Sequence, residues 1–330
     1  MTEPLVYLNG QFVPGPPAIP AGDAGFVFGA TVTDRVRTFR GQLFRLDDHL
    51  ARFRESCHLC RVPLPVSDEE LRAAAGRLVS SPHPPGDPLR GYPAPTRGEG
   101  EEEVLDSSPP SPLVGEGGRG GEGKPTSTPD LALILLATPG PLDTGPPTVM
   151  MHTFPLPFAR YRKLFTEGAT LVVPPTQPIP AECIDPRAKV RSRMHWWIAE
   201  QQAKEIDPDA SALLVDVYSR VTETAAANFL IVKDGTVLTP PRDTVLPGVS
   251  LRVVEELCGE LGIPFAERPL RLAECQSADE AMLTCTSYCV AGVRRLGSVE
   301  LPWPGPVWRR LLAAWSARVG VDIAAQILQS

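Results

Sequence analysis

Two ionisable residues, Glu223 and Lys189, lie in sequence segments where their side chains could take part in catalysis. Glu223 lies in the segment VTETAAANFLIV, where neighbouring threonines and three alanines have side chains small enough to let a planar ligand approach the backbone. Lys189 stands about thirty residues upstream, ahead of a run with helical spacing. A carboxylate and an amine at one site serve acid, base and covalent chemistry. Each also has an ordinary interpretation, because most Glu and Lys side chains are exposed at the surface.

A third segment, LPGVSLRVVEEL from Leu246, has the composition of an anion site. Gly248 precedes Val249 and Ser250 at the expected start of a helix, where backbone N–H groups lack intrahelical partners and a hydroxyl is at hand. An ordinary helix cap is the alternative interpretation. Between Glu223 and this segment, the apolar runs 229–232 and 236–238 flank a Lys-Asp-Gly turn and predict a β-hairpin.

These segments resemble the class IV (fold-type IV) pyridoxal-phosphate-dependent aminotransferase family, which contains branched-chain aminotransferases, D-amino-acid aminotransferases and aminodeoxychorismate lyase. Four ordered motifs carry the resemblance: FGATVTDRVRTFRG with DHLARF, Lys189 with the helix after it, VTETAAANFLIV, and LPGVS. The resemblance extends over nearly the whole chain, apart from one insertion and the last twenty or so residues. It implies pyridoxal 5′-phosphate as the cofactor and an amino acid and a 2-oxo acid as the substrates.

The resemblance also implies roles for the two ionisable residues. Lys189 stands fourteen residues ahead of Ala203, as the family's active-site lysine does. It would bond to the cofactor's aldehyde and then carry a proton between the substrate Cα and the cofactor. Glu223 would pair with the pyridine nitrogen and keep it protonated, which makes the ring an electron sink.

Further positions match the family's cofactor and substrate sites. The expected phosphate-binding residues are Arg52 in DHLARF, Val249, Ser250 and Thr286 in LTCTSY, although Thr286 is equally plausible as an ordinary sheet residue. The expected substrate-binding residues are Thr33, Arg37, Met194 and Ser287.

The motifs depart from the family pattern at positions that bear on substrate choice. Thr33 replaces a common aromatic residue, Met194 stands where branched-chain enzymes commonly have Tyr, and the segment 138–141 lacks the Arg-rich loop of D-amino-acid enzymes. Arg37, with Arg191 and Arg193, could bind a second carboxylate or simply form surface ion pairs. We expect an aminotransferase with a branched-chain-like preference. The alternatives are an aminodeoxychorismate lyase, which the stretch ETAAAN resembles, and a family relative that binds a ligand without turnover.

Composition excludes other classes of protein. The 330 residues carry a net charge of −7, which disfavours nucleic-acid binding, and the content of 42% hydrophobic and 22% charged residues is ordinary for a globular protein. The acidic N-terminus and the lack of any run of eighteen apolar residues predict no membrane segment and a cytoplasmic location. The odd number of seven cysteines indicates reduced thiols, and the Cys57-x-x-Cys60 pair has no second ligand pair at zinc-site spacing, so we expect no metal.

The pattern of elements predicts an α+β fold in two domains. Residues 1–155 should form a small domain with an α/β sandwich-like build, and residues 156–330 a larger pseudo-barrel domain, with the cofactor between them and a homodimer as the assembly; the pseudo-barrel, cofactor position and dimer follow from the resemblance. Pro and Gly make up close to half of residues 82–129, which predicts a disordered surface insertion or, alternatively, a partner-binding segment. A further β-hairpin is expected within 5–13, around an Asn9-Gly10 turn. Helices are expected after caps at Asp47 and Asp68, from 250 to 261, and last from 306 to 318.

Overall fold

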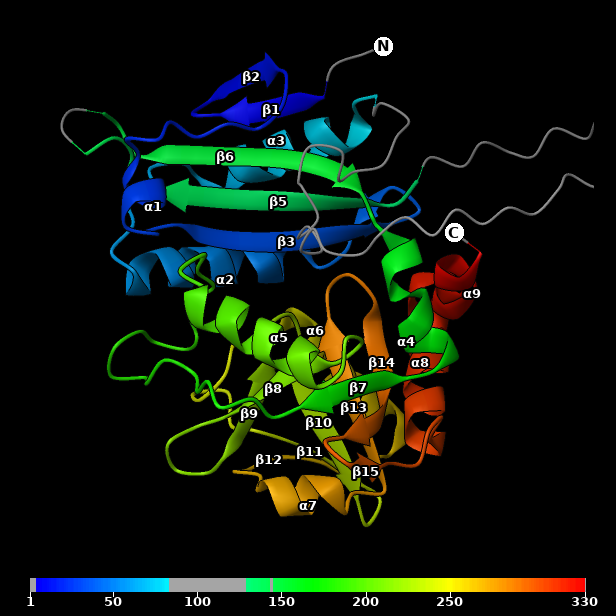
Figure 1. Ribbon diagram of the computed structural model, residues 1–330. Helices are drawn as coiled ribbons and strands as arrows, with labels where there is room; N and C mark the ends of the chain where they lie inside the picture. The colour runs from blue at the N-terminus through cyan, green and yellow to red at the C-terminus, as the bar shows by residue number, and fades with distance from the viewer. Residues whose placement is uncertain (1–3, 83–128, 143–144, 330) are drawn as a thin grey trace, which may run out of the picture.

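The computed structural model describes residues 4–82, 129–142 and 145–329, which form two β-sheets with helices around them (Figure 1). Most of the expected insertion, residues 83–128, lies outside the described residues. The first sheet uses strands up to residue 155 and the second begins at residue 169. This arrangement is compatible with a domain boundary at 155/156, and the boundary itself stays a prediction.

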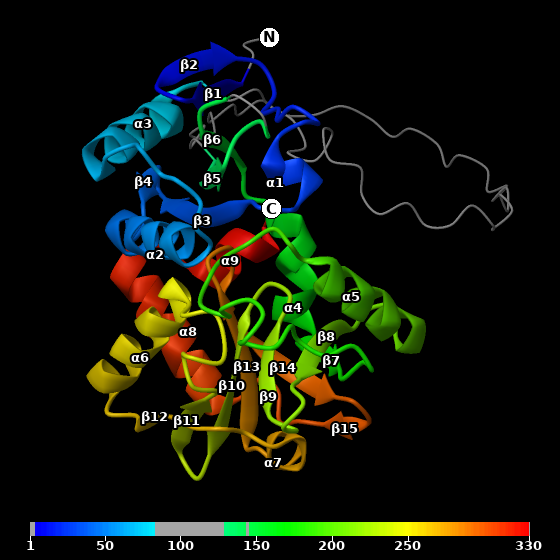
Figure 2. The same ribbon diagram turned by 90° about the vertical axis from the view of Figure 1, so that its left-hand side faces the viewer.

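The first sheet has six strands in the order β2-β1-β6-β5-β3-β4, and its neighbouring strands are antiparallel. Its strands are β1 (Leu5–Leu8), β2 (Gln11–Pro14), β3 (Val32–Phe39), β4 (Gln42–Leu43), β5 (Leu131–Thr138) and β6 (Thr148–Pro155). The helices of this part are α1 (Ala24–Val27), α2 (Leu46–Leu59) and α3 (Asp68–Ser80). Helices α2 and α3 cover one face of the sheet, where Val36, Phe53, Leu71 and Leu133 are buried in one core (Figure 2). The other face of β3 turns toward the second sheet (Figure 1).

The second sheet closes on itself. Strands β10, β13, β14, β7, β8 and β9 pair in that order, and β9 pairs back to β10 through Glu223 and Asn228, which completes a ring of six strands. Strands β11, β12 and β15 extend it outside the ring. This ring confirms the predicted pseudo-barrel, and with the separate smaller sheet it confirms the α+β fold. The strands are β7 (Ala169–Val172), β8 (Ser211–Val215), β9 (Val221–Thr224), β10 (Asn228–Lys233), β11 (Thr236–Thr239), β12 (Phe265–Glu267), β13 (Glu280–Cys285), β14 (Cys289–Leu296) and β15 (Val299–Glu300).

Helices pack around the barrel. Helix α5 lies against β7 and β8 through Ala199 and the fully buried Ala203, and α6 and α8 cover the side formed by β13 and β14 (Figures 1 and 2). The helices of this part are the short 3-10 turn η1 (Phe158–Tyr161), α4 (Arg162–Thr166), α5 (Met194–Ile206), α6 (Val249–Leu261), α7 (Leu272–Gln276), α8 (Pro306–Val319) and α9 (Ile323–Leu328). Within the described residues, no helix is long and apolar enough to cross a membrane.

The local predictions are largely confirmed, with small shifts at helix starts. The hairpins around Asn9-Gly10 and Asp234-Gly235 form, and all four of these residues have positive φ. Asp47 is not the cap of α2, because the helix begins at Leu46 and Asp47 lies in its first turn, where its charge still favours the N-terminus. Similarly, Ser67 rather than Asp68 caps α3, since the Ser67 side chain accepts from the backbone N–H of Glu70.

Candidate active site

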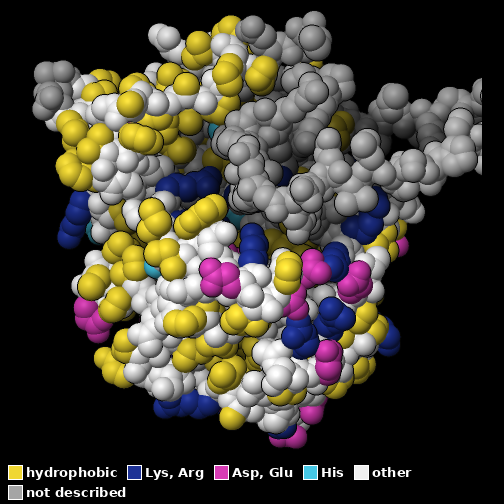
Figure 3. Space-filling view, viewed as in Figure 1, with side chains coloured by type: hydrophobic (Ala, Val, Ile, Leu, Met, Phe, Trp, Pro, Cys, Tyr) yellow, Lys and Arg dark blue, Asp and Glu magenta, His cyan; other side chains and the backbone are white. Residues whose placement is uncertain are grey.

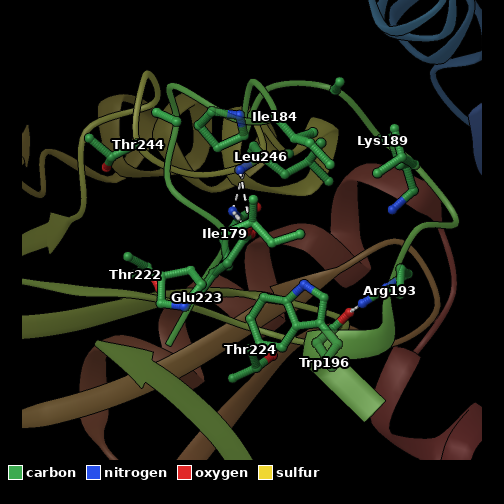
Figure 4. Close-up of a pocket in the computed structure, with 18 of the residues that line it drawn as sticks. Ile179, Ile184, Lys189, Arg193, Trp196, Thr222, Glu223, Thr224, Thr244 and Leu246 are labelled. Carbon is green, nitrogen blue, oxygen red and sulfur yellow. Dashed lines mark hydrogen bonds between the residues drawn. The ribbon is translucent and has the colours of Figure 1, made fainter. Parts of the chain in front are cut away.

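A cavity of about 220 Å³ opens between the end of β9, the N-terminus of α6, the segment 178–193 and α2. Six residues predicted from the sequence line it: Arg52, Lys189, Glu223, Val249, Ser250 and Thr286. These residues come from both parts of the chain, and the fold brings them together although they are spread over more than two hundred positions. Figure 4 shows Lys189 and Glu223 entering the cavity from different segments.

Lys189 is fixed through its backbone. Its carbonyl accepts from the N–H of Thr33 at 2.9 Å, its own N–H donates to Ser56 Oγ at 3.0 Å, and the adjacent Val190 forms a β-bridge to Val32. The segment 188–191 therefore runs along the edge of β3 and over α2. Burial, reinforced by the positive charge of Arg52, lowers the pKa of Lys189 to about 7. A substantial share of the amine is thus neutral near neutral pH and able to act as a nucleophile or base.

Glu223 is held by hydrogen bonds to both carboxylate oxygens. Asn228 Nδ2 donates to Oε2 at 3.1 Å, and the N–H of Leu246 donates to Oε1 at 3.1 Å (Figure 4). Asn228 is positioned opposite Glu223 by the β9–β10 pairing that closes the barrel. Burial raises the pKa of Glu223 to about 7. A half-buried carboxylate of this kind favours a ligand that brings a positively charged N–H group to it.

The N-terminus of α6 forms the third part of the cavity. Gly248 is the N-cap without a side-chain cap bond, so the first backbone N–H groups of the helix, at Val249 and Ser250, are available to an anion. A Cβ at position 248 would lie 2.1 Å from Asn228 Oδ1, so glycine is required beside the Asn228 that holds Glu223. Arg52 Nη1 lies 3.4 Å from the carbonyl oxygen of Pro247, which brings its positive charge to the same end of the cavity.

The four residues predicted to bind substrate lie outside the lining of this cavity. Thr33 Oγ1 donates to the carbonyl of Leu135 at 2.9 Å, Met194 is 70% exposed, and Ser287 is buried and accepts from Arg35 Nη1. Arg37 is not a spare cation: it is buried, donates to Ser287 O and to Gln326 Oε1, and lies 3.9 Å from Asp130. The substrate role of these four residues stays a prediction.

Several residues of the site were missed by the sequence reasoning. Asp34 receives two hydrogen bonds from Arg52, Asn228 holds Glu223, and Trp196 forms part of the wall. Arg35 is not among the residues that line the cavity, but its positive charge is near enough to Lys189 to lower the pKa of that lysine. The alternation of side chains along β3 was the signal that would have found it, since Arg35 shares a face with Thr33 and Arg37. Among the described residues there is no cluster of three or more His, Cys, Asp or Glu side chains suited to a metal ion, and all seven cysteines are free.

Comparison with known proteins decides the family. The model of the amino-transferase class IV family matches residues 31–108 and 115–296. This chain belongs to the class IV aminotransferases. A putative branched-chain-amino-acid aminotransferase of Methanocaldococcus jannaschii is 27% identical over 297 residues, covering 86% of this chain and 84% of the relative. A D-alanine aminotransferase of Staphylococcus aureus is 23% identical over 318 residues, covering 93% and 94%.

The fold comparison agrees. A solved structure of the T.th. branched-chain amino acid aminotransferase, complexed with N-(5′-phosphopyridoxyl)-L-glutamate, matches with a TM-score of 0.73 at 21% identity, covering 97% of this chain and 95% of that chain. The resemblance and enzyme class expected from the sequence are thus confirmed. Class IV aminotransferases use pyridoxal phosphate, and the expected cofactor is confirmed at the level of the family.

The residues present fit this cofactor. Its phosphate requires donors and positive charge, which the N-terminus of α6 and Arg52 offer at one end of the cavity. Its pyridine nitrogen requires a carboxylate, and both oxygens of the half-buried Glu223 are already oriented by hydrogen bonds. Its aldehyde requires an amine, and Lys189 is the one lysine among the described residues that lines the cavity. The three requirements are met by three different segments of the chain.

Proposed function

We propose that this enzyme transfers an amino group between an amino acid and a 2-oxo acid in the cavity described above, with Lys189 as its catalytic amine. The observation that carries this assignment is the placement of a half-buried lysine of lowered pKa in the same cavity as a half-buried carboxylate, Glu223. Aminotransfer requires a base that returns a proton after removing it, and an amine with a pKa near 7 does both at neutral pH.

Each residue has a distinct task in this proposal. When bound, the cofactor supplies the aldehyde that accepts the amino group and an aromatic ring that accepts electrons. Glu223 keeps the ring nitrogen protonated, the N–H groups of Val249 and Ser250 hold the phosphate together with Arg52 and Thr286, and Asn228 orients Glu223. Lys189 Nζ removes the proton from the substrate Cα and delivers it again, and its fixed backbone holds the amine within reach of that atom.

We propose a branched-chain-like amino acid as the substrate. Apolar side chains, among them Ile179, Ile184 and Trp196, line the cavity (Figure 4). The relative from M. jannaschii is named a putative branched-chain-amino-acid aminotransferase, which supports the same substrate class. An aminodeoxychorismate lyase is the second candidate within the family, on the strength of the ETAAAN stretch at Glu223.

A donor panel tests the proposal. The pure protein, saturated with pyridoxal phosphate, is incubated with L- and D-amino acids and either 2-oxoglutarate or pyruvate, and the new amino acid is quantified by chromatography. Transfer from L-leucine, L-isoleucine or L-valine supports the proposal. Release of pyruvate from aminodeoxychorismate, without transfer from any amino acid, would instead establish the lyase.

We further propose that the enzyme is a cytoplasmic homodimer. Phe26 of α1 and Phe28, which directly follows α1, are 73% and 71% exposed, and Met194 and Trp197 of α5 are 70% and 54% exposed. The end of α1 and the start of α5 come near each other, because Ser192 Oγ, two residues before α5, donates to the carbonyl of Gly29, two residues after α1, at 2.6 Å. Large apolar side chains gathered on one face are typical of a protein interface. The seven free cysteines fit the reducing cytoplasm.

Light scattering on the purified chain tests the assembly. We expect a dimer for the natural protein and a monomer for the double variant Phe28→Glu with Trp197→Glu, while Val217→Glu, at another exposed apolar position, should leave the dimer intact. A natural protein that is monomeric at micromolar concentration would refute the dimer.

A further inference from the structure

Arg35 is a cation without a carboxylate partner in the described part of the chain. It lies on β3 between Asp34 and Val36, both of which face α2, so alternation turns Arg35 toward the barrel. By contrast, Arg37 on the same strand pairs with Asp130, and Arg52 on α2 pairs with Asp34. The guanidinium of Arg35 instead donates through Nη1 to Ser287 Oγ at 3.1 Å.

Arg35 lies beside the reacting end of the cavity. Its partner Ser287 directly follows Cys285 and Thr286, which line the cavity. Two positions before Arg35 on β3, the backbone N–H of Thr33 donates to the carbonyl of Lys189. Burial lowers the pKa of Lys189 first, and the charge of Arg35 is near enough to lower it further, together with those of Arg52 and Arg193.

The surroundings fix the guanidinium and leave its charge uncompensated. The ring centre of Phe154 on β6 lies 5.6 Å from the guanidinium carbon and covers one side of the group. Burial, with the charges of Arg191 and Arg35, lowers the pKa of His152 to about 4, so this neighbour is neutral at physiological pH and supplies no negative charge. On the face of the molecule in Figure 3, Lys and Arg side chains gather along the boundary between the two layers.

We propose that Arg35, supported by Ser287, binds a carboxylate of the amino-acid substrate. The inference rests on the proposed function, in which Glu223 and the N-terminus of α6 hold the cofactor and the substrate meets Lys189, whose segment runs beside β3. A half-buried guanidinium is stable there when a ligand supplies the anion, and its planar donors match a carboxylate. The carboxylate is either the one on Cα, which every substrate carries, or a second one on an acidic side chain.

Binding of unreactive acids to the cofactor-loaded enzyme tests the inference. Succinate and butyrate have the same number of carbons and differ in one carboxylate, so the pair separates the two sources of the anion. Their dissociation constants are measured by calorimetry for the natural protein, Arg35→Gln, Arg35→Lys and the control Arg309→Gln, whose residue is exposed on α8. The visible absorbance of the bound cofactor and the melting temperature of each variant report whether the site has kept its structure.

We expect Arg35→Gln to weaken succinate binding by roughly ten- to a hundred-fold, as for the loss of a charge-assisted hydrogen bond. Arg35→Lys should recover part of the affinity, and Arg309→Gln should match the natural protein. An equal loss for butyrate assigns Arg35 to the carboxylate on Cα, and a loss confined to succinate assigns it to a second carboxylate. Unchanged binding of both acids by a folded Arg35→Gln variant, or no binding of either acid by the natural protein, would overturn the inference.

The proposed function can fail separately. Acid binding requires no turnover, so a natural protein that binds succinate through Arg35 and transfers no amino group would refute the aminotransferase activity and leave Arg35 as a carboxylate-binding residue. Where turnover is observed, the KM for the amino acid should rise in Arg35→Gln by a larger factor than kcat falls.

Discussion

Arg52 and Asp34 form a buried, bidentate ion pair between α2 and β3. Nε and Nη2 of Arg52 donate to the two carboxylate oxygens at 2.9 and 2.8 Å, and His49 Nδ1 lies 2.8 Å from one of them. Burial disfavours the ionised carboxylate, yet the charge and hydrogen bonds of Arg52 and the contact with His49 hold the pKa of Asp34 below its usual range. Arg52 therefore has a structural task in addition to the phosphate contact that we propose for it.

This pairing predicts that Arg52→Ala destabilises the cofactor-free protein. Removing the guanidinium leaves Asp34 fully buried without its cation, which costs about 3–5 kcal/mol in comparable buried pairs. The free energy of unfolding is measured by urea denaturation. The control is Arg54→Ala on the same helix, whose pair with Asp68 is about one-third exposed, so that its loss should cost about 1 kcal/mol or less.

The double variant Arg52→Ala with Asp34→Asn separates the two tasks of Arg52. Neutralising Asp34 should restore much of the stability, while the affinity for pyridoxal phosphate should remain roughly ten- to a hundred-fold below that of the natural protein, because the phosphate has lost a charged donor. Full recovery of cofactor affinity in the double variant would show that Arg52 does not bind the phosphate.

Lys189→Ala should abolish the covalent attachment of the cofactor. Among the described residues no other lysine lines the cavity, so the pH-dependent visible absorbance and the adduct that borohydride fixes to the protein should both disappear. Mass spectrometry after reduction measures the adduct. Lys204→Ala is a matched control, since Lys204 is exposed on α5 and the adduct should persist. A full-stoichiometry adduct in Lys189→Ala would contradict the assignment.

Glu223→Gln should separate cofactor binding from turnover. The amide still forms hydrogen bonds, so affinity for the cofactor should change little, but it no longer favours a protonated ring nitrogen, and single-turnover amino transfer should slow by orders of magnitude. Stopped-flow absorbance at saturating cofactor measures the rate. Glu205→Gln, at an exposed position on α5 away from the cavity lining, should leave the rate unchanged. A Glu223→Gln variant with normal turnover would remove Glu223 from the chemistry.

Local signals in the sequence were sufficient for much of the fold. The hairpin at Asn9-Gly10 and the start of α6 after Gly248 depend on a few adjacent residues whose conformations are restricted, and the structure has both. The last helix, α9, was not predicted, because its six residues carry too little periodicity. Helix α9 is stabilised because Ile323 and Ile327 are buried in the hydrophobic core of the larger part of the molecule.

Long-range polar pairing was the part that the sequence could not supply. Lys189 and Glu223 were selected because their motifs occur together and in the right order, and both residues line the cavity. Arg37 looked like a free cation because its partners, Asp130 and Gln326, are far away in the chain and meet it only in the folded state. The ion pair between Arg52 and Asp34 was also missed. Its two residues are only eighteen positions apart, but they lie on a helix and a strand that meet only in the folded state.

The pKa shifts of Lys189 and Glu223 predict how the stability of the cofactor-free protein depends on pH. The pKa of Lys189 is about 7 in the folded chain and 10.5 ordinarily, so between these values the unfolded chain holds the extra proton and raising the pH stabilises the fold. The pKa of Glu223 is about 7 in the folded chain and 4.5 ordinarily, so the folded chain holds the extra proton there and raising the pH from 4.5 to 7 destabilises the fold.

Because of these two residues, the free energy of unfolding should pass through a minimum near pH 7. Replacing Lys189 should alter the pH dependence only above this minimum, and replacing Glu223 only below it. Lys189→Met should flatten the rise in unfolding free energy between about pH 7 and 10 relative to the natural protein, and Glu223→Gln should flatten the fall between about pH 5 and 7. Urea denaturation across this range, compared variant by variant, measures both slopes. If Lys189→Met kept the slope of the natural protein above pH 7, the amine would not be buried in the neutral form on which its proposed role as a base depends.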